Sequence, residues 1–192
     1  MDAHEKAQTL HRNVSLPNII LHRPEQGARR AGYLIDWELG VVPRNRAPYD
    51  HVLAVCPIVL CPTVKVLIYL KGTPAFMSIE ALDMLGHVHG FEDDLESFIY
   101  VVLYAALRWL PVESPHSLRW RFTTFFGAPD PEGCGGGADA KQNNAISHKY
   151  TRSLKTTRSS QVLQWVNDAV DLHYKGWHLN PVWVDAKALK RM

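Results

Sequence analysis

Near its N-terminus the chain reads His11-Arg12-Asn13-Val14-Ser15-Leu16-Pro17-Asn18. A second signature, Asp36-Trp37-Glu38, follows the apolar run Tyr33-Leu34-Ile35, and a third reads Gly72-Thr73-Pro74-Ala75-Phe76-Met77-Ser78-Ile79-Glu80. Each signature alone is a weak signal, because short motifs recur by chance. Their order is informative, since Asp94-Leu95-Glu96-Ser97 then opens a long apolar stretch.

In this order the signatures resemble the catalytic loop, the metal-binding triplet and the end of the activation segment of a protein kinase. The whole pattern is similar to that of the fungal-type protein kinase family, from about His11 to Leu110. The resemblance implies a mainly α (α+β) fold, the C-terminal lobe of a kinase-like domain, with a small β element around Ile19 to Ile35. It also implies ATP-dependent serine/threonine phosphorylation of a protein substrate.

The resemblance carries roles onto single residues. Asn13 stands where the family has the aspartate that accepts the substrate proton, beside His11, which braces the loop, and Arg12, which anchors the activation segment. Asn18 and Asp36 stand where the family binds Mg and, through it, ATP. Both are hard oxygen ligands of the kind that Mg prefers.

Two further positions match the family as scaffold. Glu80 corresponds to the activation-segment glutamate that pairs with a distant arginine. Asp94 corresponds to the aspartate that caps backbone amides of the catalytic loop from the start of a buried helix. Trp37-Glu38 departs from the usual Phe-Gly of kinases and removes the glycine at which the triplet would turn.

The chain departs from an active kinase at two points. The neutral amide of Asn13 has no useful basicity, and general base catalysis typically contributes about a hundred- to ten-thousand-fold in rate. The 192 residues also contain no Val-Ala-x-Lys strand or glycine loop ahead of the catalytic loop. We therefore expect the N-terminal lobe to be absent, ATP and Mg not to be bound productively, and little or no phosphotransfer.

Composition indicates one globular unit, and together with the resemblance this predicts that residues 1–192 form a single partial kinase-like domain. The 21 Lys and Arg against 19 Asp and Glu give a net charge of only +2, which offers no field for nucleic acid. Cys56, Cys61 and Cys134 include no Cys-x-x-Cys pair, which favours a reducing compartment. Because the first residues lack an apolar signal core, we expect an intracellular protein, cytoplasmic or nuclear.

Residues 52–70 differ from their surroundings, being almost entirely apolar apart from Lys65, with Pro57 and Pro62 inside. As a membrane span the run is barely long enough and is interrupted by these residues. As an ordinary activation loop it would expose too much apolar surface. The third interpretation is a foreign or inserted segment, such as a retained intron. No other part of the chain suggests a membrane.

Elsewhere the pattern predicts mostly helix. Residues 93–110 are apolar around nearly the whole circumference, including Phe98 and Leu103, which predicts a buried helix. Residues 161–174 predict a second packed helix, 138–147 a short one and 2–10 a turn or two, whereas 18–21 and 33–35 predict short strands. The Pro- and Gly-rich residues 111–137 predict a long connection.

Other features favour no site. The run Gly133 to Ala138 fits a loose phosphate-loop pattern but follows no strand. His87 and His89, with Cys56 and Cys61, match no standard zinc spacing. Trp109, Trp120 and Trp165 are most simply core or groove residues. Two alternatives to an enzyme remain, a non-catalytic pseudokinase module that binds a protein partner through the face an N-terminal lobe would cover, and a truncated gene product.

Overall fold

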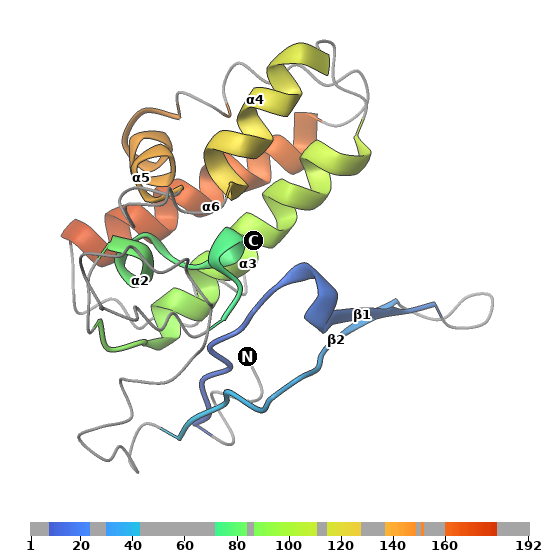
Figure 1. Ribbon diagram of the computed structural model, residues 1–192, viewed down its shortest axis with the longest axis vertical. Coiled ribbons are helices and arrows are strands. Elements are labelled where there is room, and N and C mark those ends of the chain that lie inside the picture. Colours follow the sequence, from blue (N-terminus) through green and yellow to red (C-terminus); the bar gives the residue numbers. More distant parts are fainter. Residues whose placement is uncertain are drawn as a thin grey trace, which may run out of the picture.

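The computed structural model describes residues 8–23, 30–42, 72–83, 87–110, 115–127, 137–148, 151 and 160–179. A two-stranded hairpin leads away from a group of helices, and the segment that carries the first signature runs between them (Figure 1). The prediction of a mainly helical fold with a small β element is therefore confirmed. The apolar run 52–70, residues 2–7 of the helical turn predicted over 2–10 and all three cysteines lie outside the described residues. Residues 8–10 are not helical, since Leu10 pairs with Val41.

The central helix, α3, spans Phe91–Trp109 and so begins two residues before the predicted start. Its first turn is acidic, which complements the positive end of the helix dipole. The amide of Gly90 donates to Asp93 Oδ2 over 2.6 Å and caps the same end. Leu103 is 1% exposed as predicted, but Phe98 is 36% exposed, so the prediction of an all-round buried helix was wrong. One side of α3 faces solvent because its helical neighbours cover the other.

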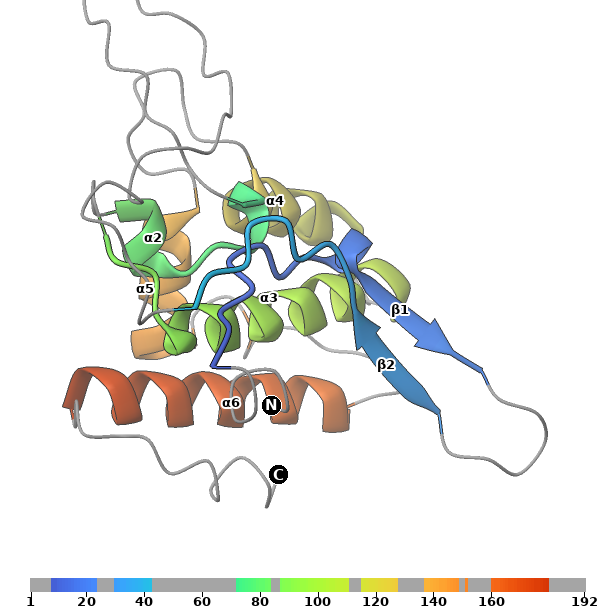
Figure 2. The same ribbon diagram turned by 90° about the horizontal axis from the view of Figure 1, so that it is seen from below.

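Helix α6, Ser160–Leu179, runs alongside α3 (Figure 2) and contains the predicted helix 161–174. Helix α5, Ala138–Ser147, has the predicted bounds. Apolar residues of α3, α4, α5 and α6 share one core, which includes Leu103, Leu107, Phe125, Ala145, Leu163 and Val166. None of the helices in the described ranges has both the length and the apolar character needed to cross a membrane.

The prediction of a connection over 111–137 was wrong for its first half, since Pro115–Phe126 forms helix α4. A proline is well tolerated where a helix begins, because the first turn needs no amide hydrogen there. Phe125 is 2% exposed, and Phe126 lies 5.1 Å from Tyr104 and 6.0 Å from Phe76, between ring centroids. The local sequence pattern for this helix is weak, and the packing of its phenylalanines on the core stabilises it.

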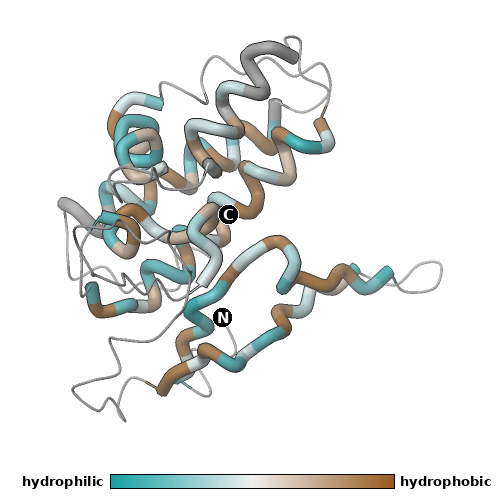
Figure 3. Tube along the Cα trace, viewed as in Figure 1, coloured by the Kyte–Doolittle hydropathy of each residue, from teal (hydrophilic) through white to brown (hydrophobic). Residues whose placement is uncertain are grey.

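The hairpin consists of β1, Ile19–His22, and β2, Ala31–Leu34, paired antiparallel with Ile19 opposite Leu34 and His22 opposite Ala31. Both strands lie within one or two residues of the predicted ranges. Ile19 and Leu34 pack on a second core of Val14, Phe76, Tyr100 and Val101. A two-stranded sheet is marginal by itself, so this packing stabilises the base of the hairpin. Figure 3 colours part of the hairpin as hydrophobic, and Ile20 and Leu21 in β1 are exposed.

The chain forms two short elements at the third signature. The 3-10 helix η3, Pro74–Phe76, buries Phe76 against α3 and α4. The short helix α2, Ile79–Asp83, follows directly, and Ser78 Oγ accepts a hydrogen bond from the amide of Ala81 at its start, over 3.2 Å. A further 3-10 turn, η1, Leu16–Asn18, leads into β1. These elements position the three signatures next to one another.

Candidate functional site

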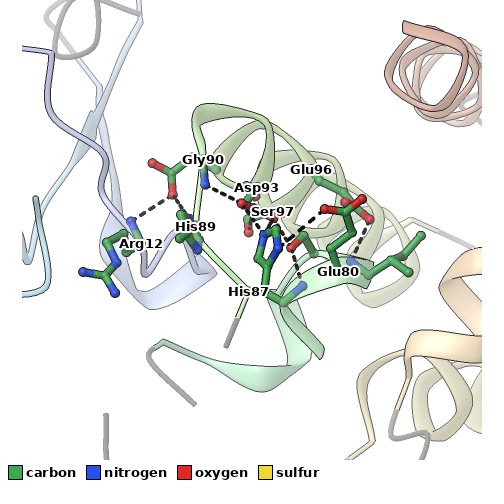
Figure 4. A network of polar contacts seen from close by, with 12 residues as sticks. Arg12, Glu80, His87, His89, Gly90, Asp93, Glu96 and Ser97 are labelled. Atoms are coloured by element: carbon green, nitrogen blue, oxygen red, sulfur yellow. Dashed lines mark hydrogen bonds and ion pairs between the residues drawn. The ribbon is translucent and has the colours of Figure 1, made fainter. Parts of the chain in front are cut away.

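The catalytic-loop signature is fixed at its start by a carboxylate of α3. Asp94 Oδ2 accepts a hydrogen bond from the amide of His11 over 2.6 Å, and Oδ1 accepts one from the amide of Arg12 over 2.9 Å. The same Oδ1 lies 3.0 Å from His89 Nε2 (Figure 4). Hydrogen bonds to a carboxylate are about twice as strong as neutral ones. Asp94 thus makes the contact with the loop amides that the resemblance implies for it.

His11 joins the first signature to the second. Its ring is buried, and Nδ1 accepts a hydrogen bond from the amide of Asn13 over 3.2 Å. Its Nε2 lies 2.9 Å from the carbonyl oxygen of Ile35, which assigns the ring proton to Nε2. The ring of Trp37 meets it edge-on at 4.6 Å, and Trp37 Nε1 donates to the carbonyl of Leu34. His11 therefore braces the loop against the residues that precede Asp36.

The third signature contacts the first signature at Asn13. Thr73 Oγ1 donates to Asn13 Oδ1 over 3.0 Å. Gly72 adopts a φ of +109°, and a Cβ atom there would lie 2.7 Å from the carbonyl oxygen of Arg12. Only glycine allows both this backbone conformation and this close approach. The side chain of Asn13, which the resemblance aligns with the family's catalytic base, thus contacts the third signature.

The two residues in the metal-binding positions lie on adjacent segments. The carbonyl of Asn18 accepts a hydrogen bond from the amide of Ile35 over 2.9 Å, one residue before Asp36. Asn18 Nδ2 donates to the carbonyl of Asn13 over 2.9 Å, which leaves the side-chain oxygen as an acceptor. The exposed carboxylate of Asp36 makes no hydrogen bond or ion pair with the described residues.

These two oxygen donors suit Mg²⁺, which binds proteins through one or two carboxylates together with substrate phosphates. Arg12 and Asp36 both adopt left-handed backbone conformations, with φ of +66° and +64°. Such conformations are uncommon for residues other than glycine and gather at functional sites. In the described part of the chain, no group of three or more His, Cys, Asp and Glu residues could hold a metal by itself. Asn18 and Asp36 thus offer oxygen donors from two segments that a backbone hydrogen bond joins.

A second polar network lies between α2 and the start of α3 (Figure 4). His87 Nε2 lies 2.9 Å from Asp93 Oδ2, and His87 Nδ1 lies 3.6 Å from Glu80 Oε2. Ser78 Oγ donates to the same Asp93 carboxylate. The resemblance implies a distant arginine for Glu80, and His87 also lies beside its carboxylate.

Hydrogen bonding within this network changes the acidity of both partners. The hydrogen bond to Asp93 raises the pKa of His87 above its ordinary value, against a smaller opposing effect of burial. Burial raises the pKa of Asp93, but the hydrogen bond to His87, the charge of His89 and the hydrogen bond from Ser78 together lower it below its ordinary value. His87 and His89, whose spacing matches no standard zinc site, thus bind neighbouring carboxylates.

Sequence reasoning missed Lys141 on α5. Its side chain is 1% exposed, and Nζ donates to the carbonyls of Met77 over 2.7 Å and of Ala75 over 3.2 Å. A signal was available, because positions 138, 141 and 145 share one helix face on which Ala138 and Ala145 are buried. A lysine on an apolar face indicates a buried partner for its charge.

Two of the tryptophans assigned to core or groove are instead on the surface. Trp109 is 63% exposed and Trp120 is 52% exposed, whereas Trp165 packs on the core shared by α3 and α6. Trp109 is the last residue of α3, whereas Trp120 lies in the middle of α4.

The sequence matches the family model described as fungal protein kinase over residues 2–106, slightly more than half of the 192 residues. The matched range contains the three signatures and most of α3. No curated protein and no solved structure matches the chain.

Proposed function

This chain belongs to the fungal protein kinase family, and from that premise we propose that it forms the C-terminal lobe of a kinase-like domain with an impaired phosphotransfer step. The reaction class is ATP-dependent phosphorylation of serine or threonine, as the family resemblance implies. The described helices and hairpin are consistent with such a lobe, because they bring the first signature at His11 to Asn18, the residues before Asp36 and the third signature at Gly72 and Thr73 into contact.

The observation that carries the impairment is the side chain at position 13. The loop around it is well supported, with its amides on Asp94 and its histidine on Ile35. Asn13 nevertheless presents an amide oxygen, which accepts the hydroxyl hydrogen of Thr73. An amide accepts a hydrogen bond but not a proton near pH 7. A substrate hydroxyl can thus be oriented here without being deprotonated.

Asn18 and Asp36 are the residues that would hold Mg with ATP. A bound Mg–ATP would supply the phosphoryl group and neutralise charge on its phosphate oxygens. Asn18 is held in place by its own hydrogen bond to Asn13, and Asp36 is open to solvent. Because the 192 residues contain no motif that matches the family's phosphate-holding lysine or glycine loop, we propose that this chain binds the nucleotide too weakly for turnover.

A phosphotransfer assay with labelled ATP and Mg tests the proposal. The purified chain should transfer no phosphate to itself or to generic protein substrates above background. Asn13→Asp should not restore transfer, because it returns the base without holding the phosphates. Asp36→Ala is the control for any signal that is seen. An ATP-dependent signal that Asp36→Ala abolishes would show the chain to be an active kinase.

A second candidate, a non-catalytic module that binds a protein partner, is favoured by the surface of the hairpin. Leu21 is 79% exposed, Tyr33 56% and Ile20 48%, and Ile35 and Trp37 are also exposed. Large apolar side chains gathered on one element indicate a surface that another protein covers.

A photo-crosslinking residue at position 33 tests this candidate. A specific partner should be captured without ATP, should be lost with Leu21→Asp and should be kept with Asp36→Ala. Leu21→Asp should leave the melting temperature unchanged, since the Leu21 side chain packs little on the protein. Capture that survives Leu21→Asp would argue against the hairpin as the binding surface.

A further inference from the structure

The segment 72–78, which contains most of the third signature, is held from two sides. On one side it meets the catalytic loop, through Gly72 against Arg12 and Thr73 against Asn13. On the other side it meets α5, an element nearly seventy residues later in the chain, through the side chain of Lys141. We propose that Lys141 is a positioning residue that holds this segment against the catalytic loop.

The first reason is the chemistry of the groups that Lys141 binds. In η3 the amides of Phe76 and Met77 donate to the carbonyls of Thr73 and Pro74. The carbonyls at the end of a short helix have no partner within it and need a donor from elsewhere. Lys141 Nζ supplies two hydrogen bonds at this point, to the carbonyl of Ala75 within η3 and to that of Met77 directly after it.

The second reason is that the side chain of Lys141 is buried within the core. It is fully enclosed, and Nζ lies 4.2 Å from the centroid of the Tyr100 ring of α3, as in a cation–π contact. Burying the long side chain of a lysine costs free energy unless its head group is paired. Its partners are the carbonyls of Ala75 and Met77, which belong to the segment 72–78, and the ring of Tyr100, which packs with Phe76 of that segment.

The third reason is the path from Lys141 to Asn13. The segment between the two contacts is short, and Phe76 within it is buried against Val14 of the catalytic loop and Tyr100 of α3. A shift of the carbonyls at 75 and 77 therefore moves Thr73, and with it the hydrogen bond to Asn13 Oδ1. Lys141 acts through this segment and touches no residue of the catalytic loop itself.

Burial lowers the pKa of Lys141 to about 7, while the charge of Glu96 acts in the opposite direction. The titratable groups that face it are Glu96 and Tyr100, both on α3. The hydrogen bonds to the two carbonyls remain possible in either protonation state, because a neutral amine still has N–H donors. Removing the donors therefore tests the proposal more directly than changing the pH.

Amide hydrogen exchange of the intact 192-residue chain provides the test, by NMR or mass spectrometry, comparing the wild type with Lys141→Met. Methionine keeps much of the shape of the lysine stem and removes every donor. Exchange at the Phe76 and Met77 amides should accelerate by about tenfold or more, since two buried hydrogen bonds to this segment are lost. Amides of α3 and α6 should keep their wild-type rates. Gln142→Met, at an exposed position of the same helix, is the matched control.

A readout at the catalytic loop separates positioning from plain stability. The side-chain amide signals of Asn13 should shift in Lys141→Met and stay in place in Gln142→Met. Lys141→Arg, which restores the donors, should return both the exchange rates and the Asn13 signals toward the wild type. Equal acceleration throughout the chain, or unchanged Asn13 signals, would overturn the proposal.

If Lys141→Met does not fold, Lys141→Gln takes its place, since its NH₂ group keeps two N–H donors at shorter reach and should give an intermediate effect. Unprotected Phe76 and Met77 amides in the wild type would overturn the proposal without any variant. The importance of this segment for phosphotransfer rests on the proposed function, but the exchange measurement needs no ATP and no activity. Failure of the proposal for Lys141 and failure of the proposed kinase function therefore give different results.

Discussion

At the scale of single residues, the site depends on carboxylates of α3 that point back toward loops far away in the sequence. Asp94 holds the catalytic loop, and its neighbour Asp93 holds Ser78 and His87. Neither carboxylate can be replaced by a neutral side chain without leaving buried donors unpaired.

Asp94→Ala should lower the free energy of unfolding by about 2 to 4 kcal/mol, because it leaves the buried amides of His11 and Arg12 without an acceptor. Chemical denaturation measures the change. Asp139→Ala, an exposed carboxylate in the first turn of α5, removes the same charge without a buried partner and should cost less than about 1 kcal/mol. Equal losses in the two variants would contradict the assigned role of Asp94.

The His87–Asp93 pair should make stability depend on pH. The raised pKa of His87 gives stability that is present below its ordinary value of 6.5 and is lost as the pH rises through the folded value. The lowered pKa of Asp93 gives stability that is present above its ordinary value of 3.8 and is lost as the pH falls through the folded value. The pair therefore contributes most between about pH 3.8 and 6.5.

Urea denaturation of the wild type and His87→Gln, between pH 5 and 8, measures this contribution. The wild type should lose its advantage over the variant as the pH rises. The comparison with the variant is needed because Lys141, whose pKa is lowered to about 7, contributes stability that increases as the pH rises above about 7. A constant difference between the two proteins would exclude the pair as a pH-sensitive contact.

At the scale of elements, α3 is the helix on which the other described parts depend. One side of it packs on α4 and α6, its first turn holds the catalytic loop and α2, and its remaining side is open. Its sequence is apolar on both sides, so that hydrophobic pattern alone does not distinguish the buried side from the exposed one. The exposed fractions of individual side chains distinguish the buried side from the exposed one.

Leu103→Ala should destabilise the protein by about 2 to 5 kcal/mol, because it creates a cavity in a closed part of the core. Phe98→Ala should cost less than half as much, since Phe98 is 36% exposed and its removal leaves a depression filled by water. Thermal or chemical denaturation of the two variants makes the comparison within one helix. Equal costs would show that the open side of α3 is covered in solution.

At the scale of the whole molecule, the long connection between the second and third signatures begins and ends at one place. Val41 pairs with Leu10, and Gly72 lies against Arg12, so that its two ends meet the same short stretch. The residues left after removal of 52–70, namely 43–51 and 71, can span this short gap at roughly 3.3 Å each. The apolar run is therefore not needed to close the chain.

Deleting residues 52–70 should raise solubility and leave the melting temperature unchanged or higher, if the run is foreign to the fold. A membrane span would instead make the intact chain partition into detergent, with a normal melt for the deleted form. Expression, detergent partitioning and melting of both forms separate the two outcomes. A deleted form that melts at a lower temperature would show that the run belongs to the folded domain.

The sequence by itself determined the family, the three signatures, the bounds of α5 and most of α3 and α6, because motif order and helical periodicity are local properties. It also placed Asp94 at a helix start, where a capping carboxylate is expected. Only the tertiary structure decided that Phe98 faces solvent, that residues 115–126 form a helix, that His87 and His89 bind neighbouring carboxylates and that Lys141 reaches Ala75 and Met77. Each of these depends on which surfaces meet, and such contacts join residues too far apart for a local pattern to record.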